Sequence, residues 1–481
     1  MLVAGATAVA AQIPAALLAA GLCAGGRTTA VTRWFALLVL LTPPYVYAYA
    51  WSLPLLPGGV ASFALTQHTW LAALGTYVRA IVCLACWSAP LSAFLLAAAW
   101  KRAGRPAYRL ALLDSPAHAA LLRAGLPAMR LWIGLSTSVI AALALTEYSV
   151  PHLCLVQTWN TEVLAEIQSA GPNGRALLLG WPLLVLVLLI ALAWWPLRQR
   201  IAPLLLDMGR YEDLETDLGG KAVGRSGVAR LATAAAVVLL LSPFIVLLSW
   251  LQSPARIIQI PATTRQVWLG ALSWAVVAGV FALLIAVPVV AGFSERTANR
   301  PAVALGRMAR GLLIAVALFF AIAPPALVGD AFVAAYLRLP WIYNHGVIIS
   351  LVGAARFAFI PLLVVWLASR TRDLGTDEMA RTDRADRAQR FWHVAVPQCM
   401  RPALCAALMV SLLTLGEVAA VQLVQPAGVG SVAMTLLNQI HFGRNDEIIA
   451  MCLHVGAVVG VVSWLALLVT RTATKSGRKA I

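Results

Sequence analysis

Runs of about 20 consecutive apolar residues recur along the whole chain, and they limit its possible folds more than any other feature. A helix needs roughly 20 such residues to cross a bilayer, where every backbone N–H and C=O must be bonded within the segment. We count eleven runs of this kind. They lie near residues 3–24, 34–55, 70–100, 131–150, 177–197, 231–252, 267–292, 312–335, 346–368, 403–424 and 447–470. The sequence therefore predicts an all-α, polytopic membrane protein with about 11 transmembrane helices.

Composition excludes the other broad classes of protein. Of 481 residues, 61% are hydrophobic and 11% are charged, whereas soluble domains carry roughly 25% charged residues. A soluble globule, a disordered chain and a small disulfide scaffold are all inconsistent with these values.

The basic residues alternate between the two sides of the predicted membrane. Of 36 Lys and Arg residues, 29 fall in alternate loops or the tail, and the opposite loops hold five. Basic loops stay in the cytoplasm, so we expect a cytoplasmic C-terminus and an N-terminus outside. The net charge of +17 is then a topology signal and predicts no nucleic-acid partner. The basic segments are 25–33, 101–130, 198–230, 295–310, 369–401 and the residues after 470.

An internal repeat relates the two parts of the chain. The spacing from proline to glutamate is identical in both (147 − 127 = 417 − 397). A proline pair, which breaks a helix, also recurs. Because both parts have the same predicted orientation, this is a parallel duplication of the kind that surrounds a translocation path. The matched positions are Leu126-Pro127 with Val396-Pro397, Glu147 with Glu417, and Pro43-Pro44 with Pro324-Pro325.

The repeat defines the predicted domains. The first half covers 1–197, and we expect it to lack one leading helix, since it has one apolar run fewer than the second. A polar cytoplasmic linker covers 198–230, the second half covers 231–471, and a cytoplasmic tail covers 472–481.

The most informative loop runs from Glu378 to Pro397. Charged residues alternate there with apolar ones at roughly helical spacing, which predicts a short amphipathic helix that Pro397 stops. A solvated basic loop that only sets topology is the alternative. The apolar positions are Leu374, Met379, Ala388, Phe391 and Trp392.

This loop resembles that of the permease subunits of binding-protein-dependent ABC importers, whose pattern is E-A-A, three residues, G, nine residues, I-x-L-P. The matching positions are Glu378, Ala380, Val394, Val396 and Pro397. Met379 replaces an alanine, and Arg384 replaces the glycine that normally permits a turn.

The equivalent loop of the first half, Tyr108–Pro127, is more degenerate. It keeps Leu126 and Pro127 but has Asp114 at the glycine position. The flanking stretches, Leu145–Pro151 and Leu415–Glu417 with Pro426–Gly428 and His441–Gly443, look like those of fused iron(III)-type permeases.

The resemblance implies that both loops form coupling helices that dock on a separate ATPase present in two copies. It also implies an external or periplasmic solute-binding protein and the cytoplasmic (inner) membrane of a bacterium. Iron(III) is the favoured cargo, with thiamine, phosphonate or polyamine-like solutes as alternatives. The rival of another class is a secondary transporter driven by an ion gradient. The implied coupling residues are Glu378, Ala380, Arg384, Phe391, Trp392, Val394, Val396, Pro397, Asp114, Leu126 and Pro127.

The chain lacks the sequence of a nucleotide-binding loop. No G-x-x-x-x-G-K-[ST] occurs, and Thr474 precedes the Lys475-Ser476 pair where that loop needs glycine. We therefore expect no enzymatic activity and no bound cofactor in this chain, with ATP used by the partner subunit.

Three acidic residues lie within apolar segments, where a charge is costly and usually functional. Glu147, Glu417 and Asp330 could line the pathway or gate of a cationic substrate. The alternative, which we favour, is that they pair with Arg79, Arg356 or backbone groups and join helices.

The seven cysteines mostly lie in apolar runs. Cys83 and Cys86 form a C-x-x-C without a second Cys or His pair nearby, so we interpret the cysteines as small buried hydrophobes and expect no metal site.

The loop assignment gives a first prediction. Glu378→Lys, or deletion of 384–392, is expected to abolish transport without preventing membrane insertion, because either change damages the surface that receives the ATPase. Solute uptake and membrane fractionation check this, and a variant that still transports would contradict the assignment.

Overall fold

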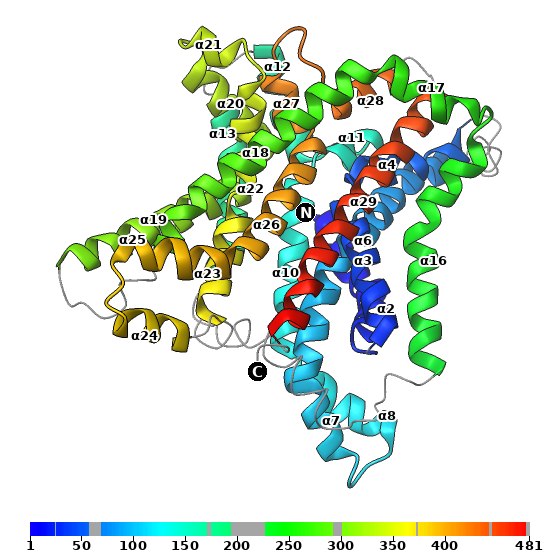
Figure 1. The fold of residues 1–481 in the computed structure, drawn as a ribbon. Helices are drawn as coiled ribbons and strands as arrows, with labels where there is room; N and C mark the ends of the chain where they lie inside the picture. The colour runs from blue at the N-terminus through cyan, green and yellow to red at the C-terminus, as the bar shows by residue number, and fades with distance from the viewer. Residues whose placement is uncertain are drawn as a thin grey trace. The chain divides into compact units, whose positions relative to one another are not determined.

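The structure is a computed structural model, and every element in its described part is helical (Figure 1). Because most of the chain is apolar, helices satisfy its backbone donors and acceptors within each segment. The described residues are 1–24, 26–56, 69–170, 175–193, 227–291, 301–371, 374–441 and 445–477. Most of the predicted linker 198–230 and the end of the tail lie outside them.

Six helices are long and apolar enough to cross a membrane, or up to 10 if each of four bent helix pairs counts as one span. These figures rest on length and composition. The predicted segment 177–197 corresponds to a shorter apolar helix, Leu178–Ala193. The prediction of an all-helical, multi-pass chain is thus confirmed, and the predicted count of eleven is not.

The two most strongly bent pairs lie at the repeated proline pairs. Helices α3 (Gly26–Leu41) and α4 (Pro44–Ala50) meet at 85°, and α19 (Pro301–Ile322) and α20 (Pro325–Tyr336) meet at 116°. Pro43 and Pro324 have nearly the same extended backbone (φ −56°, ψ 136° and φ −53°, ψ 132°). A residue that precedes proline avoids the helical region, so the first proline of each pair ends one helix and the second begins the next. The sequence-based prediction of these breaks is confirmed.

The chain forms two compact units, each assembled from separate stretches of sequence. The first contains Met1–Glu162, Gly180–Ile258 and Arg444–Gly460. The second contains Val163–Leu179, Gln259–Gly443 and Val461–Ile481.

Within the first unit, α2 packs against α6 and α16, and α1 packs against α10. Most of helix α16 lies in the predicted second half, and the helix nonetheless belongs to this unit. The bounds are α1 Leu2–Ala10, α2 Gln12–Leu22, α6 Thr69–Ala99, α10 Arg130–Thr146 and α16 Gly227–Trp250.

A polar contact joins three of these helices. Gln12 Oε1 accepts hydrogen bonds from Ser92 Oγ (2.9 Å) on α6 and Ser136 Oγ (3.1 Å) on α10. Both serines are fully buried. Such bonds between apolar helices are worth roughly 1 kcal/mol each and fix the helices' rotation about their axes.

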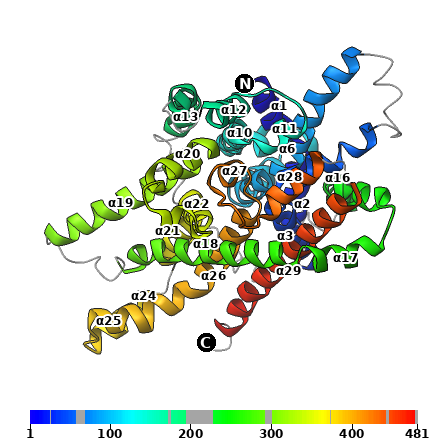
Figure 2. The ribbon, with the colours of Figure 1, turned by 90° about the horizontal axis from the view of Figure 1, so that it is seen from above.

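The second unit is built around α18, which packs on α22 and α26 (Figure 2) and also on α23. Its core consists mainly of alanine and valine, and small side chains let helix backbones approach closely. The bounds are α18 Arg265–Ala291, α22 Val347–Phe357, α23 Phe359–Thr371 and α26 Val396–Leu415. Core residues of α18 include Ala282, Ala286 and Val289.

The remaining helices connect these elements or flank them. They are α11 Ser149–Leu153, α12 Trp159–Ala170, α13 Arg175–Ala193, α17 Ala255–Thr263, α21 Pro340–Tyr343, α27 Ala419–Val424, α28 Val432–His441 and α29 Asn445–Gly477, with a 3₁₀ turn at Leu53–Leu55.

Gly279 marks a close approach of α18 to α26. A Cβ at this position would lie 2.5 Å from Ser411 Oγ and 2.7 Å from the Ala407 carbonyl oxygen. The Ala407 carbonyl oxygen belongs to the backbone of α26 and cannot rotate away as a side chain could, so the two helices would have to separate.

This contact gives a stability prediction. Gly279→Ala should destabilise the protein by about 1–3 kcal/mol, the usual cost of overpacking. Gly311→Ala is the matched control, because nothing lies within 4 Å of the added Cβ and alanine favours the helix by about 1 kcal/mol. Unfolding titrations in SDS–detergent mixtures measure both, and equal stabilities would contradict the tight contact.

Candidate functional site

The first-half loop is a folded helical hairpin. Helix α6 continues through a π-helical turn η2 into α7, and after a turn the chain returns through α8, a second π turn η3 and α9. Helices α7 and α8 project beyond the ends of α2 and α16 within the first unit (Figure 1). The bounds are η2 Trp100–Gly104, α7 Arg105–Ala111, α8 Ala117–Ala120, η3 Leu121–Gly125 and α9 Leu126–Ala128.

The second-half loop has the same order of elements, and the predicted helix is wrong in one respect. We expected one amphipathic helix that Pro397 stops. Instead, α24 (Leu374–Thr382) ends at a turn, and α25 (Arg387–Arg390) continues through the π turn η7 (Phe391–Ala395) into α26. Pro397 stands at the second position of α26, directly after this π turn, so it does not stop the helix.

Both loops have a π turn at the same position of the repeat. The interval in sequence from η3 to η7 equals the interval from Pro127 to Pro397 (391 − 121 = 397 − 127). In each turn, the backbone N–H of the residue before the proline donates to the carbonyl of the residue five positions earlier. The Leu126 N–H donates to the Leu121 carbonyl, and the Val396 N–H donates to the Phe391 carbonyl. Because the proline ring clashes with the carbonyl four residues earlier, the preceding turn widens. π turns frequently occur at functional sites.

Arg384 adopts the conformation for which the family pattern has glycine. Its φ is +56°, and the Ala385 N–H donates to the Ala380 carbonyl at 3.0 Å. This is a Schellman helix ending, in which the left-handed residue is usually glycine. The bend therefore forms without glycine, at a cost of roughly 1 kcal/mol. Asp114, at the equivalent position, lies in a turn without positive φ.

The helix after this bend begins with a reciprocal cap. The Gln389 N–H donates to Asp386 Oδ1 at 2.6 Å, and the Asp386 N–H donates to Gln389 Oε1 at 3.0 Å. This capping box fixes the start of α25.

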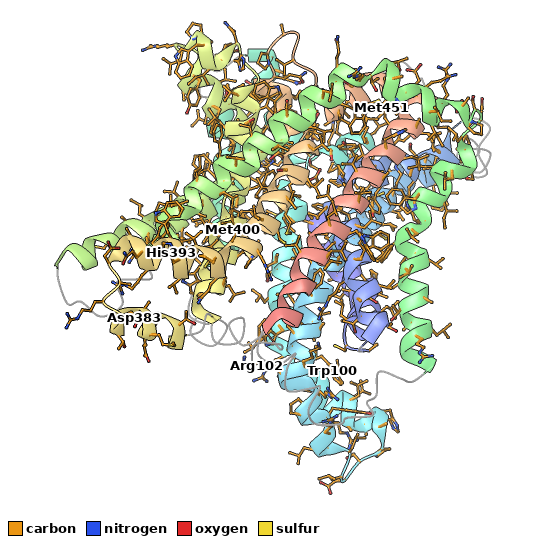
Figure 3. All side chains as sticks on the ribbon, in the orientation of Figure 1. Trp100, Arg102, Asp383, His393, Met400 and Met451 are labelled. Atoms are coloured by element: carbon orange, nitrogen blue, oxygen red, sulfur yellow. The ribbon has the colours of Figure 1, made fainter. Side chains whose placement is uncertain are left out.

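Each side of the second loop faces a different environment. Phe391 packs against the core of the second unit, Ala395 belongs to that core, and Val394 is buried. The other side of the loop is exposed, and its largest apolar side chains are Met379 (70% exposed) and Trp392 (64% exposed). The exposed set also includes Glu378, Arg384 and Pro397, and the half-buried residues are Ala380 and Val396. Figure 3 labels Asp383 at the turn and His393 in the π turn. The loop is thus anchored on one side and presents apolar and charged groups on the other.

The first loop is anchored around Trp100. A Cβ on Gly104 would lie 2.6 Å from the Trp100 ring, and one on Gly125 would lie 3.3 Å from it. The Tyr108 ring lies 5.7 Å away. Leucines cover the outside: Leu110, Leu113 and Leu122 are 69%, 78% and 62% exposed, and Leu126, Pro127 and Asp114 are also exposed.

Glu417 forms a buried ion pair with Arg356, one of the two arginines proposed as its partner. Both side chains are about 10% exposed. Glu417 Oε1 also accepts the Ala420 N–H at 3.2 Å, at the start of α27. The glutamate therefore joins α22 to the break between α26 and α27.

Glu147 caps the equivalent break. Its Oε1 accepts the Ser149 N–H at 2.8 Å and the Ser149 hydroxyl, at the start of α11. A carboxylate at a helix N-terminus satisfies free donors and interacts favourably with the helix dipole. The two glutamates thus share one structural role.

Asp330 is half-buried on α20. The preceding residue, Gly329, marks a close approach to α27, since a Cβ there would lie 3.0 Å from the Ala420 carbonyl oxygen. Asp330 thus lies on a helix that packs against α27, the helix whose start Glu417 caps.

Comparisons with family models, curated proteins and solved structures find no match for this chain. Among the described residues, no group of three or more His, Cys, Asp or Glu side chains could hold a metal ion. Any function must therefore be argued from the loops themselves.

Sequence reasoning missed the π turns, although a dipeptide ending in proline directly follows each one. The π turn before Arg105-Pro106 is a third example, since the Arg105 N–H also donates to the carbonyl five positions earlier, that of Trp100.

The buried ion pair predicts strong energetic coupling. Glu417→Gln or Arg356→Met alone should destabilise the protein by about 3–5 kcal/mol, because each leaves one buried charge without its partner. The double variant should lose clearly less stability than the sum of the two single losses. SDS unfolding titrations of all four proteins test this, and additive losses would show that the pair contributes no coupling.

Proposed function

We propose that this chain is the permease subunit of an ATP-driven ABC importer, with the two π-turn loops as its coupling elements. One observation carries the proposal. Two loops at equivalent positions of the repeat share a helix, a turn, a second short helix and a π turn before proline, in the same order. A symmetric ATPase dimer offers two equivalent grooves, and two equivalent loops would fill them.

The surfaces of the loops support docking on another protein. Exposed leucines cover the first loop, and Met379 and Trp392 are exposed on the second. Aromatic, methionine and arginine side chains are enriched at protein interfaces, and charges such as Glu378 and Arg384 would set the register of docking. These side chains lie outside the eleven apolar runs of the sequence, and an exposed apolar patch in water usually marks a site of interaction.

Anchored inner faces would transmit the movement. Because Phe391 and Ala395 pack in the core of the second unit, a displacement of the loop would move α18, α23 and α26 with it. We infer that closure of the ATPase dimer rocks the two halves in this way. ATP hydrolysis would take place on the partner, and a solute-binding protein would deliver the cargo from outside.

The proposed cargo is iron(III), with thiamine or another small solute as the alternative. This part rests on the resemblance alone. Glu147 caps α11, and Glu417 caps α27 and pairs with Arg356 on α22, so their geometry favours a structural role over a pathway role.

Purification from the native host in mild detergent tests the proposal. A stoichiometric P-loop ATPase at two copies per chain, identified by mass spectrometry, is expected. A chain that purifies alone and moves solute in response to an ion gradient would instead indicate a secondary transporter.

Two matched variants locate the contact. Trp392→Ala should weaken ATPase binding on the order of tenfold or more, as for a buried aromatic at an interface. Trp464→Ala is the control, because this tryptophan is also exposed, by 48%, but lies on α29, far in sequence from both loops. Binding assays in detergent compare the two, and equal affinities would contradict docking at this loop.

A further inference from the structure

Three cysteines and one arginine gather where α4, α6 and α11 pack together in the first unit. Arg79, Cys83 and Cys86 lie on α6, and Cys154 directly follows α11. All three sulfur-bearing side chains are buried, with exposures of 1% for Cys83, 4% for Cys86 and 0% for Cys154. The sequence alone suggested only small buried hydrophobes at these positions.

The contacts select one pair of thiols. The thiols of Cys83 and Cys154 lie close enough to interact, although the two residues are far apart in sequence. Arg79 Nε donates to Cys154 Sγ at 3.2 Å, and Arg79 Nη2 donates to the Leu153 carbonyl at 3.1 Å. The Arg79 guanidinium is thus held against the Cys154 sulfur, with the Cys83 thiol nearby.

This arrangement favours the thiolate of Cys154. The nearby Cys83 thiol lowers the pKa of Cys154, and the charge and hydrogen bond of Arg79 lower it further, against burial, which raises it. The thiolate is the form of cysteine that attacks disulfides and other oxidants.

We propose that Cys83 and Cys154 are a redox-active pair that closes into a disulfide linking α6 to α11. The oxidant is a small disulfide compound. The Cys154 thiolate attacks one of its sulfurs, forming a mixed disulfide and releasing one thiolate. Cys83 then loses its proton and attacks the Cys154 sulfur, which forms the protein disulfide and expels the second thiolate. Two protein thiols are oxidised and one disulfide is reduced to two thiols.

The backbone beside Cys154 provides a route of access. Leu155 has φ +59° and an 84% exposed side chain, in a Schellman ending where glycine is usual. The Val156 N–H donates to the Pro151 carbonyl at 2.9 Å, and the Leu155 N–H donates to the His152 carbonyl at 3.1 Å. A leucine strained in this conformation lowers the cost of opening the turn, which would uncover Cys154.

The test uses the full-length protein purified in mild detergent and treated with 4,4′-dithiodipyridine. Peptide mapping under non-reducing conditions should recover a Cys83–Cys154 crosslink, with two thiopyridone equivalents released. Cys86→Ala, one helical turn from Cys83, should leave the crosslink unchanged. Cys83→Ser should stop the reaction at the mixed disulfide on Cys154. A crosslink between Cys83 and Cys86, or two thiols that stay free, would overturn the proposal, and neither result requires a variant.

The role of Arg79 has a separate readout. Arg79→Met should slow the first thiopyridone release on the order of tenfold near neutral pH, because the thiolate fraction falls, and Arg79→Lys should slow it less. Cys452, 1% exposed elsewhere in the same unit, should stay unmodified in every variant that remains folded. An unchanged rate in folded Arg79→Met would show that the arginine does not activate Cys154.

Discussion

Proline's missing backbone donor shapes this structure at its two steepest helix breaks and at the π turns of the described residues. In an apolar helix each N–H and C=O must find a partner within the segment, so a residue without an N–H forces a local solution. At Pro43-Pro44 and Pro324-Pro325 the helix stops and restarts at a steep angle. At Pro106, Pro127 and Pro397 the helix continues through a widened π turn. The stops at the proline pairs produce the bent helix pairs. The π turns lie where the loops join the long helices.

The same devices recur in both parts of the repeat, although the side chains around them differ. Glu147 and Glu417 each cap the helix that follows a break. Glu417 has Arg356 against it in a buried pair. The position equivalent to Arg356 in the first half is Cys86 (356 − 86 = 417 − 147). The arginine of the first half, Arg79, instead contacts Cys154. The two halves thus share the helix breaks and their glutamate caps, but they differ in the side chains that the arginines contact.

The proposed transport function and the proposed thiol pair depend on different parts of the chain. The loops combine an anchored face with an exposed apolar face, which is an arrangement suited to carrying force from a partner. The thiol pair lies between α6 and α11, at a distance in sequence from the second loop. A disulfide there would restrain the break after α10, where Glu147 caps α11. The failure of either proposal leaves the other intact.

The sequence by itself determined the helical, multi-pass class, the register of the repeat and the proline breaks, because these follow from local hydrophobicity and backbone chemistry. It also located the loop at Glu378–Pro397 that we propose as a coupling element, since charged residues alternating with apolar ones are a local pattern. The bend at Arg384 and the continuation through Pro397 needed the structure, because both depend on which carbonyls accept each N–H. The Arg356–Glu417 pair was one of several possible pairings until the fold brought the two residues together. Only tertiary packing could bring Cys83 to Cys154, since the two lie far apart in the chain and no periodicity in the sequence reports such a contact.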